Sequence, residues 1–172
     1  ADDLVKEYGV DAIRFYMIHE MPFASDGNYT NELLVESINS NLANVLGNLV
    51  TRTIGMVHKY FDGVVDNKNV CDELDTKLID EALGLKIKVD NCMSKLEVPK
   101  ALDSIFECLR SCNKYIDETM PWVLAKDESK QERLATVLYN LIECIRICTV
   151  LLQAFMPDTA EKIFNQINTE RT

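Results

Sequence analysis

The sequence predicts an all-α protein, built as an up-and-down helical bundle with short connections. Apolar residues recur at helical spacing over long segments, and no alternating strand pattern of useful length occurs. The composition agrees, because 47% of the 172 residues are hydrophobic while only 6 are glycine and 4 are proline. A chain of this length can bury a substantial core.

The first 30 residues predict two short helices and a loop. The first helix is broken at Gly9, the second runs from about Val10 to Glu20, and a polar loop follows around Pro22 and Gly27. We expect this stretch to be a piece of a longer chain, because it begins abruptly and carries an apolar face of its own.

Five further helical segments are predicted in order. Thr30 is a plausible N-cap of a long helix to about Phe61, which Asp62 and Gly63 end with turn chemistry. The next segments are expected at about Asp72 to Leu96, from Pro99 in a first turn to about Glu118, at about Glu128 to Phe155, and after Pro157 with Asp158 as the cap.

The charge balance limits the kinds of partner. The formal net charge is -10, so a basic footprint for coating DNA or RNA is missing, and a nucleic acid would have to be bound locally. No apolar run approaches a membrane span, so no membrane partner is expected. The chain opens without a signal peptide, which favours a cytoplasmic protein with reduced thiols.

Cysteines form two pairs that are each one helical turn apart: Cys108 with Cys112, and Cys144 with Cys148. Two such pairs could build a tetrahedral zinc site. The CxxC knuckle of structural zinc sites is absent, however, and the neighbouring residues are apolar. We therefore interpret these cysteines as small core residues and predict no metal site.

The stretch NSNLANVLGNLVTR, residues 39–52, carries several asparagines, although asparagine is a poor residue for a helix interior. At 100° per residue one broad apolar arc faces the bundle, formed by Ile38, Leu42, Val45, Leu46, Leu49, Val50 and Val57. Asn44, Asn48 and Arg52 are spaced by four and stack beside this arc, with Asn41 next to them and Asn39 on the apolar side. This edge is either a solvated border or a recognition surface.

Trp122 is the only tryptophan and follows Pro121 in a short link between helices. A link in a bundle lies at one end, where a ring can be presented to a ligand, although a buried core tryptophan is the alternative. An indole beside amides and a guanidinium suits single-stranded RNA, which needs a stacking platform and donors and acceptors for base edges.

Several motifs resemble, in order and spacing, the carboxy-terminal part of bacterial methionyl-tRNA synthetases. They are YGVDAIRFYM, PFASDGNYT, INSNLANVLGNLVTRTI, YFDG, MPWVLAK and FMPDTAEKI, and the resemblance covers essentially the whole chain. It implies a partial stem-contact region at residues 1–29 and a helical anticodon-binding domain at residues 30–172.

The resemblance also implies roles for the polar edge. Trp122 would stack on the first base of the CAU anticodon of methionine tRNA, Asn48 and Arg52 would read base edges, and Asn44 would support them. The HIGH and KMSKS motifs are absent, as is any glycine-rich phosphate loop. We therefore expect no catalytic residue and no cofactor here, and expect ATP with magnesium to bind a catalytic domain of the parent ligase.

Two alternatives stay open at this point. The chain could be the anticodon-binding domain of an isoleucine, valine, leucine or cysteine enzyme of class I, although the PW link together with the NxxxNxxxR pattern counts against this. It could instead be a helical protein-interaction adaptor that binds a basic partner, with Trp122 as an interface anchor.

Overall fold

The computed structural model describes residues 2–21 and 27–169, and all regular elements in this part of the chain are helical. The predicted loop at Pro22 lies outside the described residues. In chain order the elements are α1 (Asp2–Tyr8), α2 (Val10–Glu20), α3 (Asn31–Ser37), η1 (Ile38–Gly47), α4 (Asn48–Phe61), α5 (Glu73–Ser94), α6 (Val98–Thr119), α7 (Pro121–Leu124), η2 (Glu128–Lys130), α8 (Gln131–Leu152) and α9 (Pro157–Ile167).

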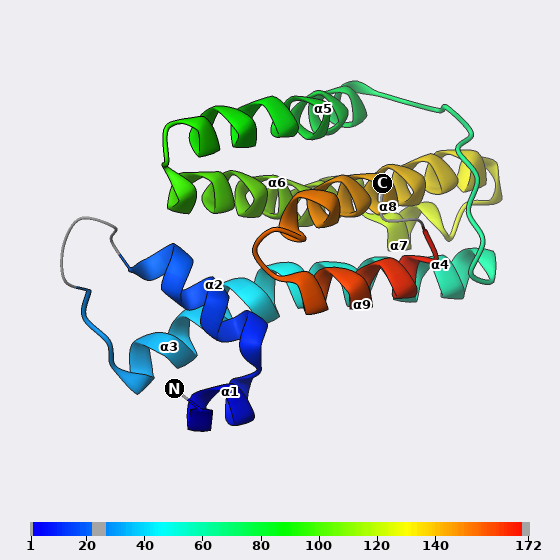
Figure 1. Cartoon of the computed structure of the whole chain (residues 1–172). Helices are drawn as coiled ribbons and strands as arrows, with labels where there is room; N and C mark the ends of the chain where they lie inside the picture. The colour runs from blue at the N-terminus through cyan, green and yellow to red at the C-terminus, as the bar shows by residue number, and fades with distance from the viewer. Residues whose placement is uncertain (1, 22–26, 170–172) are drawn as a thin grey trace.

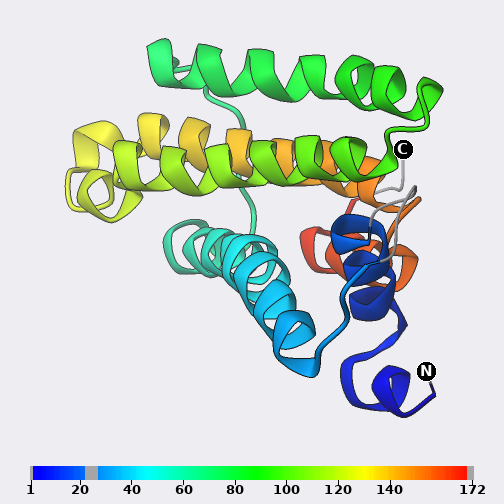
Figure 2. The same cartoon turned by 90° about the vertical axis from the view of Figure 1, so that its left-hand side faces the viewer.

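The long helices lie in three layers (Figures 1 and 2). Helix α5 forms one outer layer, α6 and α8 lie in the middle, and α4 with α9 forms the other outer layer. Successive long helices reverse direction, which confirms the predicted up-and-down bundle. The core runs between the layers, where α6 and α8 are buried along most of their lengths.

Local chemistry explains several helix ends. The Thr30 side chain accepts a hydrogen bond from the Leu33 amide at 3.1 Å, as expected of an N-cap. Helix α4 ends where Asp62 and Gly63 take positive φ angles of 54° and 88°. Asp72 caps α5 in a reciprocal capping box with Asp75. The predicted start and end of the first long helix and the predicted start of α5 are confirmed.

The middle of the first long helix differs from the prediction. Residues 38–47 form a π-helix, in which the Asn48 amide donates to the Ala43 carbonyl five residues earlier. A π-helix has more residues per turn than an α-helix, so a plot at 100° per residue drifts along this segment. Asn39 is therefore exposed, and its predicted place on the apolar side is wrong.

The predicted cap of the last helix is also wrong. Helix α9 begins at Pro157 with Met156 at the N-cap position, no side chain caps it there, and Asp158 lies exposed inside the first turn. The Thr159 amide instead donates to the Asp11 carboxylate of α2 at 2.6 Å. A cap supplied from 148 residues away leaves no local pattern in the sequence.

The cysteine pairs are buried as predicted. Cys108, Cys112, Cys144 and Cys148 are free thiols in the core, where α6 faces α8. Within residues 2–21 and 27–169, no group of three or more His, Cys, Asp or Glu side chains is arranged to hold a metal ion.

The segment that contains α8 is more apolar than we expect from the sequence. By length and composition, residues Glu128–Leu152 could cross a membrane, so the expectation that no run approaches a span is wrong. Within the bundle, however, 61% of the most apolar window is buried. This apolar character is what a central core helix requires.

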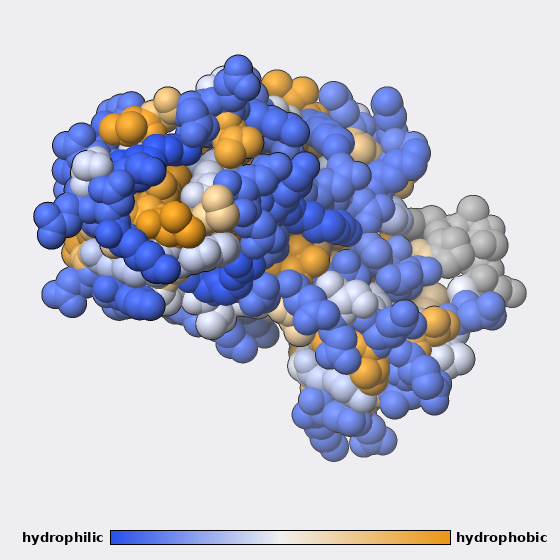
Figure 3. All heavy atoms as spheres, turned by 180° about the vertical axis from the view of Figure 1, so that it is seen from behind, coloured by the Kyte–Doolittle hydropathy of each residue, from blue (hydrophilic) through white to orange (hydrophobic). Residues whose placement is uncertain are grey.

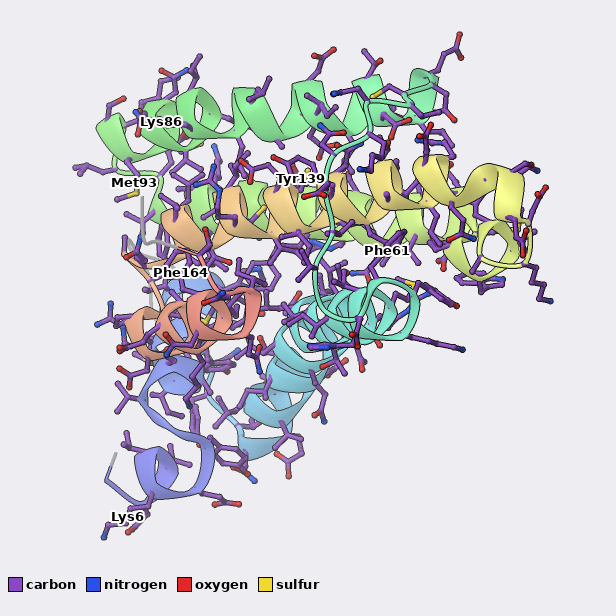
Figure 4. All side chains as sticks on the ribbon, turned by 90° about the vertical axis from the view of Figure 1, so that its right-hand side faces the viewer. Lys6, Phe61, Lys86, Met93, Tyr139 and Phe164 are labelled. Atoms are coloured by element: carbon purple, nitrogen blue, oxygen red, sulfur yellow. The ribbon has the colours of Figure 1, made fainter. Side chains whose placement is uncertain are left out.

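A buried carboxylate fixes the connection between α4 and α5, which crosses α8 beside Tyr139 (Figure 4). Asp75 is fully buried and accepts hydrogen bonds from Tyr115 at 2.6 Å, Asn140 at 2.8 Å and Arg133 at 2.9 Å. Arg133 also donates to the Val70 carbonyl at 2.9 Å. The network therefore joins α5, α6, α8 and the connection.

Asp75 is expected to contribute to stability in a pH-dependent way. Burial raises the pKa of Asp75, but the hydrogen bonds from Arg133, Tyr115 and the Asp72 amide outweigh it and lower the pKa from 3.8 to about 2. Because the folded pKa is the lower one, the stabilisation is fully present above about pH 4 and is lost as the pH falls toward 2.

Asp75→Asn should lower the free energy of unfolding by about 2 to 4 kcal/mol at pH 7 and should flatten its fall between pH 4 and pH 2. Urea unfolding at several pH values measures both effects. Asp90→Asn, in an exposed pair with Lys86, is the matched control and should change stability little. If the free energy of unfolding of Asp75→Asn fell between pH 4 and pH 2 as steeply as that of the unmodified protein, the role assigned to Asp75 would be contradicted.

Candidate functional site

The amide edge of the long helix faces solvent. Asn44 and Asn48 are exposed, whereas Leu46, Leu49 and Val50 are 3%, 0% and 5% exposed. The helix therefore buries its apolar side in the bundle and leaves two amides, one turn apart, free to meet a ligand. Asn41 is half-buried, and its side chain donates to the Ser37 carbonyl at 3.2 Å.

Arg52 lies one turn beyond Asn48 and is paired across the helices. Its Nη2 donates to Asp117 Oδ1 of α6 at 3.2 Å, with the two side chains 34% and 66% exposed. Such an exposed pair is weak, so a stronger anionic ligand can replace Asp117 at little cost. Sequence reasoning missed Asp117, since no spacing signal links residues 65 positions apart.

A second contact aligns the two helices. Asn113 of α6 donates to the Val45 carbonyl at 3.1 Å. Asp117 lies one turn after Asn113 on α6, and its partner Arg52 lies after Val45 on the long helix. The two helices therefore run in the same direction along this face. As α6 ends at Thr119, the chain that follows is placed just beyond Arg52.

Trp122 lies in α7, the single turn that follows α6 (Figure 1). Met120 takes a left-handed conformation with φ of 47°, which ends α6 and turns the chain, and Pro121 is buried. Trp122 is 41% exposed, and its neighbours Met120 and Val123 are each 45% exposed. The alternative of a buried core tryptophan is therefore excluded.

An apolar patch surrounded by hydrophilic residues marks the end of the bundle that carries α7 (Figure 3). The structure thus brings an exposed indole to the end of α6 that holds Asp117, the partner of Arg52. An aromatic surface, amide groups and a guanidinium on one side of the bundle can stack on an unpaired base and donate to or accept from its edges.

Two family models match the chain. Residues 1–54 match the family described as tRNA synthetases class I (M), and residues 65–172 match the anticodon binding domain of methionyl tRNA ligase. Among curated proteins, the methionine--tRNA ligase of Clostridium acetobutylicum is 52% identical over 97% of this chain. That of Bacillus subtilis is 46% identical over 95% of this chain. The chain spans about a quarter of the length of these relatives.

Solved structures show the same arrangement of helices. The Mycobacterium tuberculosis methionyl-tRNA synthetase in its free state is 39% identical, with a TM-score of 0.90 over 95% of this chain and 33% of that one. The same enzyme in complex with methionyl-adenylate gives a TM-score of 0.91 over 95% of this chain and 32% of that one.

The exposure of Trp122 leads to a prediction about folding. Trp122→Ala should lower the free energy of unfolding by clearly less than a truncation in the core does, because a ring that is 41% exposed leaves an open surface and no enclosed cavity. Urea unfolding followed by circular dichroism measures this change. Leu49→Ala, a fully buried position in the same bundle, is the positive control and should cost about 2 to 5 kcal/mol. A similar cost for Trp122→Ala would show that the indole supports the core.

Proposed function

The chain belongs to the methionyl-tRNA ligase family, and from this premise we propose that it binds the CAU anticodon loop of methionine tRNA. This family membership removes the isoleucine, valine, leucine and cysteine enzymes as alternatives. The observation that carries the proposal is the exposed Trp122, which lies just after the end of α6. Near that end of α6, Asp117 contacts Arg52, and Arg52 follows the exposed amides of the long helix.

Trp122 acts as the stacking platform. Its ring is held on a single helical turn between buried Pro121 and the half-buried Leu124, so little conformational freedom is lost when a base lies on it. Stacking accepts any base, so this contact supplies affinity while leaving sequence unread. We assign the first base of the anticodon to the Trp122 ring.

Asn48 and Arg52 supply the sequence-dependent contacts. An amide offers both a donor and an acceptor, and a guanidinium offers paired donors, so each can engage a base edge at two atoms. Asn44 lies one turn earlier and supports the same surface. Arg52 must leave Asp117 to do this, which costs little for an exposed pair and disfavours ligands that offer no acceptor in its place.

The parent protein joins methionine to its tRNA. In this proposal residues 1–29 belong to the stem-contact region and residues 30–172 to the anticodon-binding domain, while a catalytic domain of the same parent protein binds ATP and magnesium in the cytoplasm. In this proposal the chain takes no direct part in that chemistry. Its contribution is to hold the anticodon loop while the acceptor end is charged.

A titration at fixed salt tests the proposed function. Methionine tRNA and a variant that differs in one anticodon base are titrated into this protein, because affinities at different salt concentrations cannot be compared. Binding that favours CAU supports the proposal. Equal binding of both tRNAs would reduce the site to a general RNA contact, and binding of neither, with capture of a basic protein instead, would favour an adaptor.

Removing the platform should weaken binding of the anticodon stem-loop. Trp122→Ala is expected to cost roughly 1 to 3 kcal/mol of binding free energy, the usual range for one base-aromatic stack, with helical content intact. Trp122→Phe should keep part of this energy. Val123→Ala, at a neighbouring apolar position of similar exposure, is the matched control. Equal losses in Trp122→Ala and Val123→Ala would contradict stacking.

Removing the side chains proposed to contact base edges should reduce the enzyme's discrimination between anticodons. In a full-length enzyme that carries this domain, Arg52→Ala and Asn48→Ala should each cost more with the CAU loop than with a loop altered at its first base. The difference should be roughly 1 to 3 kcal/mol for a good edge contact. Charging of the two tRNAs measures it, and Asn39→Ala, an exposed asparagine earlier in the same helix, is the control.

Methionine activation, followed by ATP-pyrophosphate exchange, should be unchanged in both variants because this step needs no tRNA. An equal loss of charging on both tRNAs would make Asn48 and Arg52 positioning residues for the RNA backbone. A loss of exchange would point to a folding defect.

A further inference from the structure

Helix α2 lies within the first family match, which ends at residue 54, yet it is built into the bundle of the second match. Phe15 is fully buried, and its ring centroid lies 5.0 Å from that of Phe106 in α6. On the same helix, His19 stacks on Phe15 and its Nε2 lies 2.7 Å from the Asp103 carboxylate of α6. The two matched regions therefore share one core.

Two polar side chains of α2 complete the ends of two bundle helices. The first four amides of a helix have no partner within it, and Asp11 supplies one to α9 by accepting from the Thr159 amide at 2.6 Å. Its negative charge also suits a helix N-terminus. Asp11 is 8% exposed, so water competes little for this contact.

Arg14 binds the other side of the same turn. Its Nε donates to the Phe155 carbonyl at 2.8 Å and its Nη2 to the Ala154 carbonyl at 3.1 Å. These carbonyls lie just after the end of α8, where peptide oxygens lack helical partners. Asp11 and Arg14, one turn apart on α2, thus hold the start of α9 and the turn after α8 at the same time.

This attachment lies at the opposite end of the bundle from α7 (Figure 1). Helix α6, with 22 residues, is about 33 Å long at 1.5 Å per residue. A tilt of about 10° at α2 would therefore move the far end by about 6 Å, more than a hydrogen bond or a stacked base tolerates. The orientation of α2 on the bundle decides where Trp122 lies relative to residues that precede α2.

We infer that Asp11 and Arg14 are positioning residues, which fix the orientation of the anticodon-reading surface relative to the amino-terminal part of the ligase. This inference rests on the proposed function. One tRNA must reach the reading surface and the acceptor-end site together, so a loose attachment at α2 would lose the benefit of binding both. Neither residue contacts RNA in this role.

The test uses the full-length enzyme with Arg14→Ala, Arg14→Lys and Asp11→Asn. Charging of complete methionine tRNA should fall about 10- to 100-fold in kcat/KM for Arg14→Ala, because small misplacements of bound groups are costly. Arg14→Lys has a single ammonium group for two carbonyls, so it should recover only part of the lost kcat/KM. Charging of an acceptor minihelix, which lacks the anticodon arm, and ATP-pyrophosphate exchange should stay within about twofold.

Lys6→Ala is the matched control, because Lys6 is a basic residue of the same segment that points away from the bundle (Figure 4). Binding of the anticodon stem-loop to each variant shows whether the bundle itself is intact and should also stay within about twofold. The expected pattern is a loss confined to complete tRNA, which a general folding defect would not give.

Two results would overturn the inference. Normal charging of complete tRNA by Arg14→Ala and Asp11→Asn would make the contacts merely structural, and an equal loss of stem-loop binding would place their effect in the reading surface. A failure of the proposed function is a separate result, since the unmodified protein would then show no preference for the CAU stem-loop.

Discussion

Burial of Leu46, Leu49 and Val50 fixes the rotation of the long helix about its axis, and the rest of the proposed site depends on that rotation. With these side chains in the core, Asn44 and Asn48 face solvent and Arg52 reaches Asp117 on α6. The same packing lets Asn113 bind the Val45 carbonyl, which aligns α6 along this face. The end of α6 then presents Trp122. One apolar interface therefore determines where the side chains of the proposed site lie.

The polar edge carries a cost that packing offsets. Each asparagine lowers helix propensity by roughly half a kcal/mol relative to alanine, and an isolated helix with several of them would be weak. Here the apolar face stabilises the helix, including its π segment from Ile38 to Gly47. On a chain of net charge -10, a small site of neutral amides, one indole and one shielded cation favours close contact with unpaired bases over long-range attraction.

Much of this arrangement could be predicted from local chemistry. Thr30, Asp72 and Gly63 mark helix ends through caps and turns, and the four-residue spacing of Asn44, Asn48 and Arg52 predicts a common edge. Contacts between distant residues could not be predicted: Asp117 beside Arg52, and Asp11 at the start of α9. The π segment also leaves no spacing signal, so a uniform 100° per residue predicts the wrong face for Asn39. The roles of the edge residues in reading bases stay predictions.

The central claim is that a base of the anticodon lies on Trp122 and that neighbouring groups select it. Because Trp122 is the only tryptophan, its fluorescence reports on that position alone. The most direct measurement is a fluorescence titration of this protein, at one salt concentration, with anticodon stem-loops that carry CAU or a different first base. The account predicts saturable quenching by both loops, with tighter binding of the CAU loop. Binding without any change in Trp122 fluorescence would contradict it.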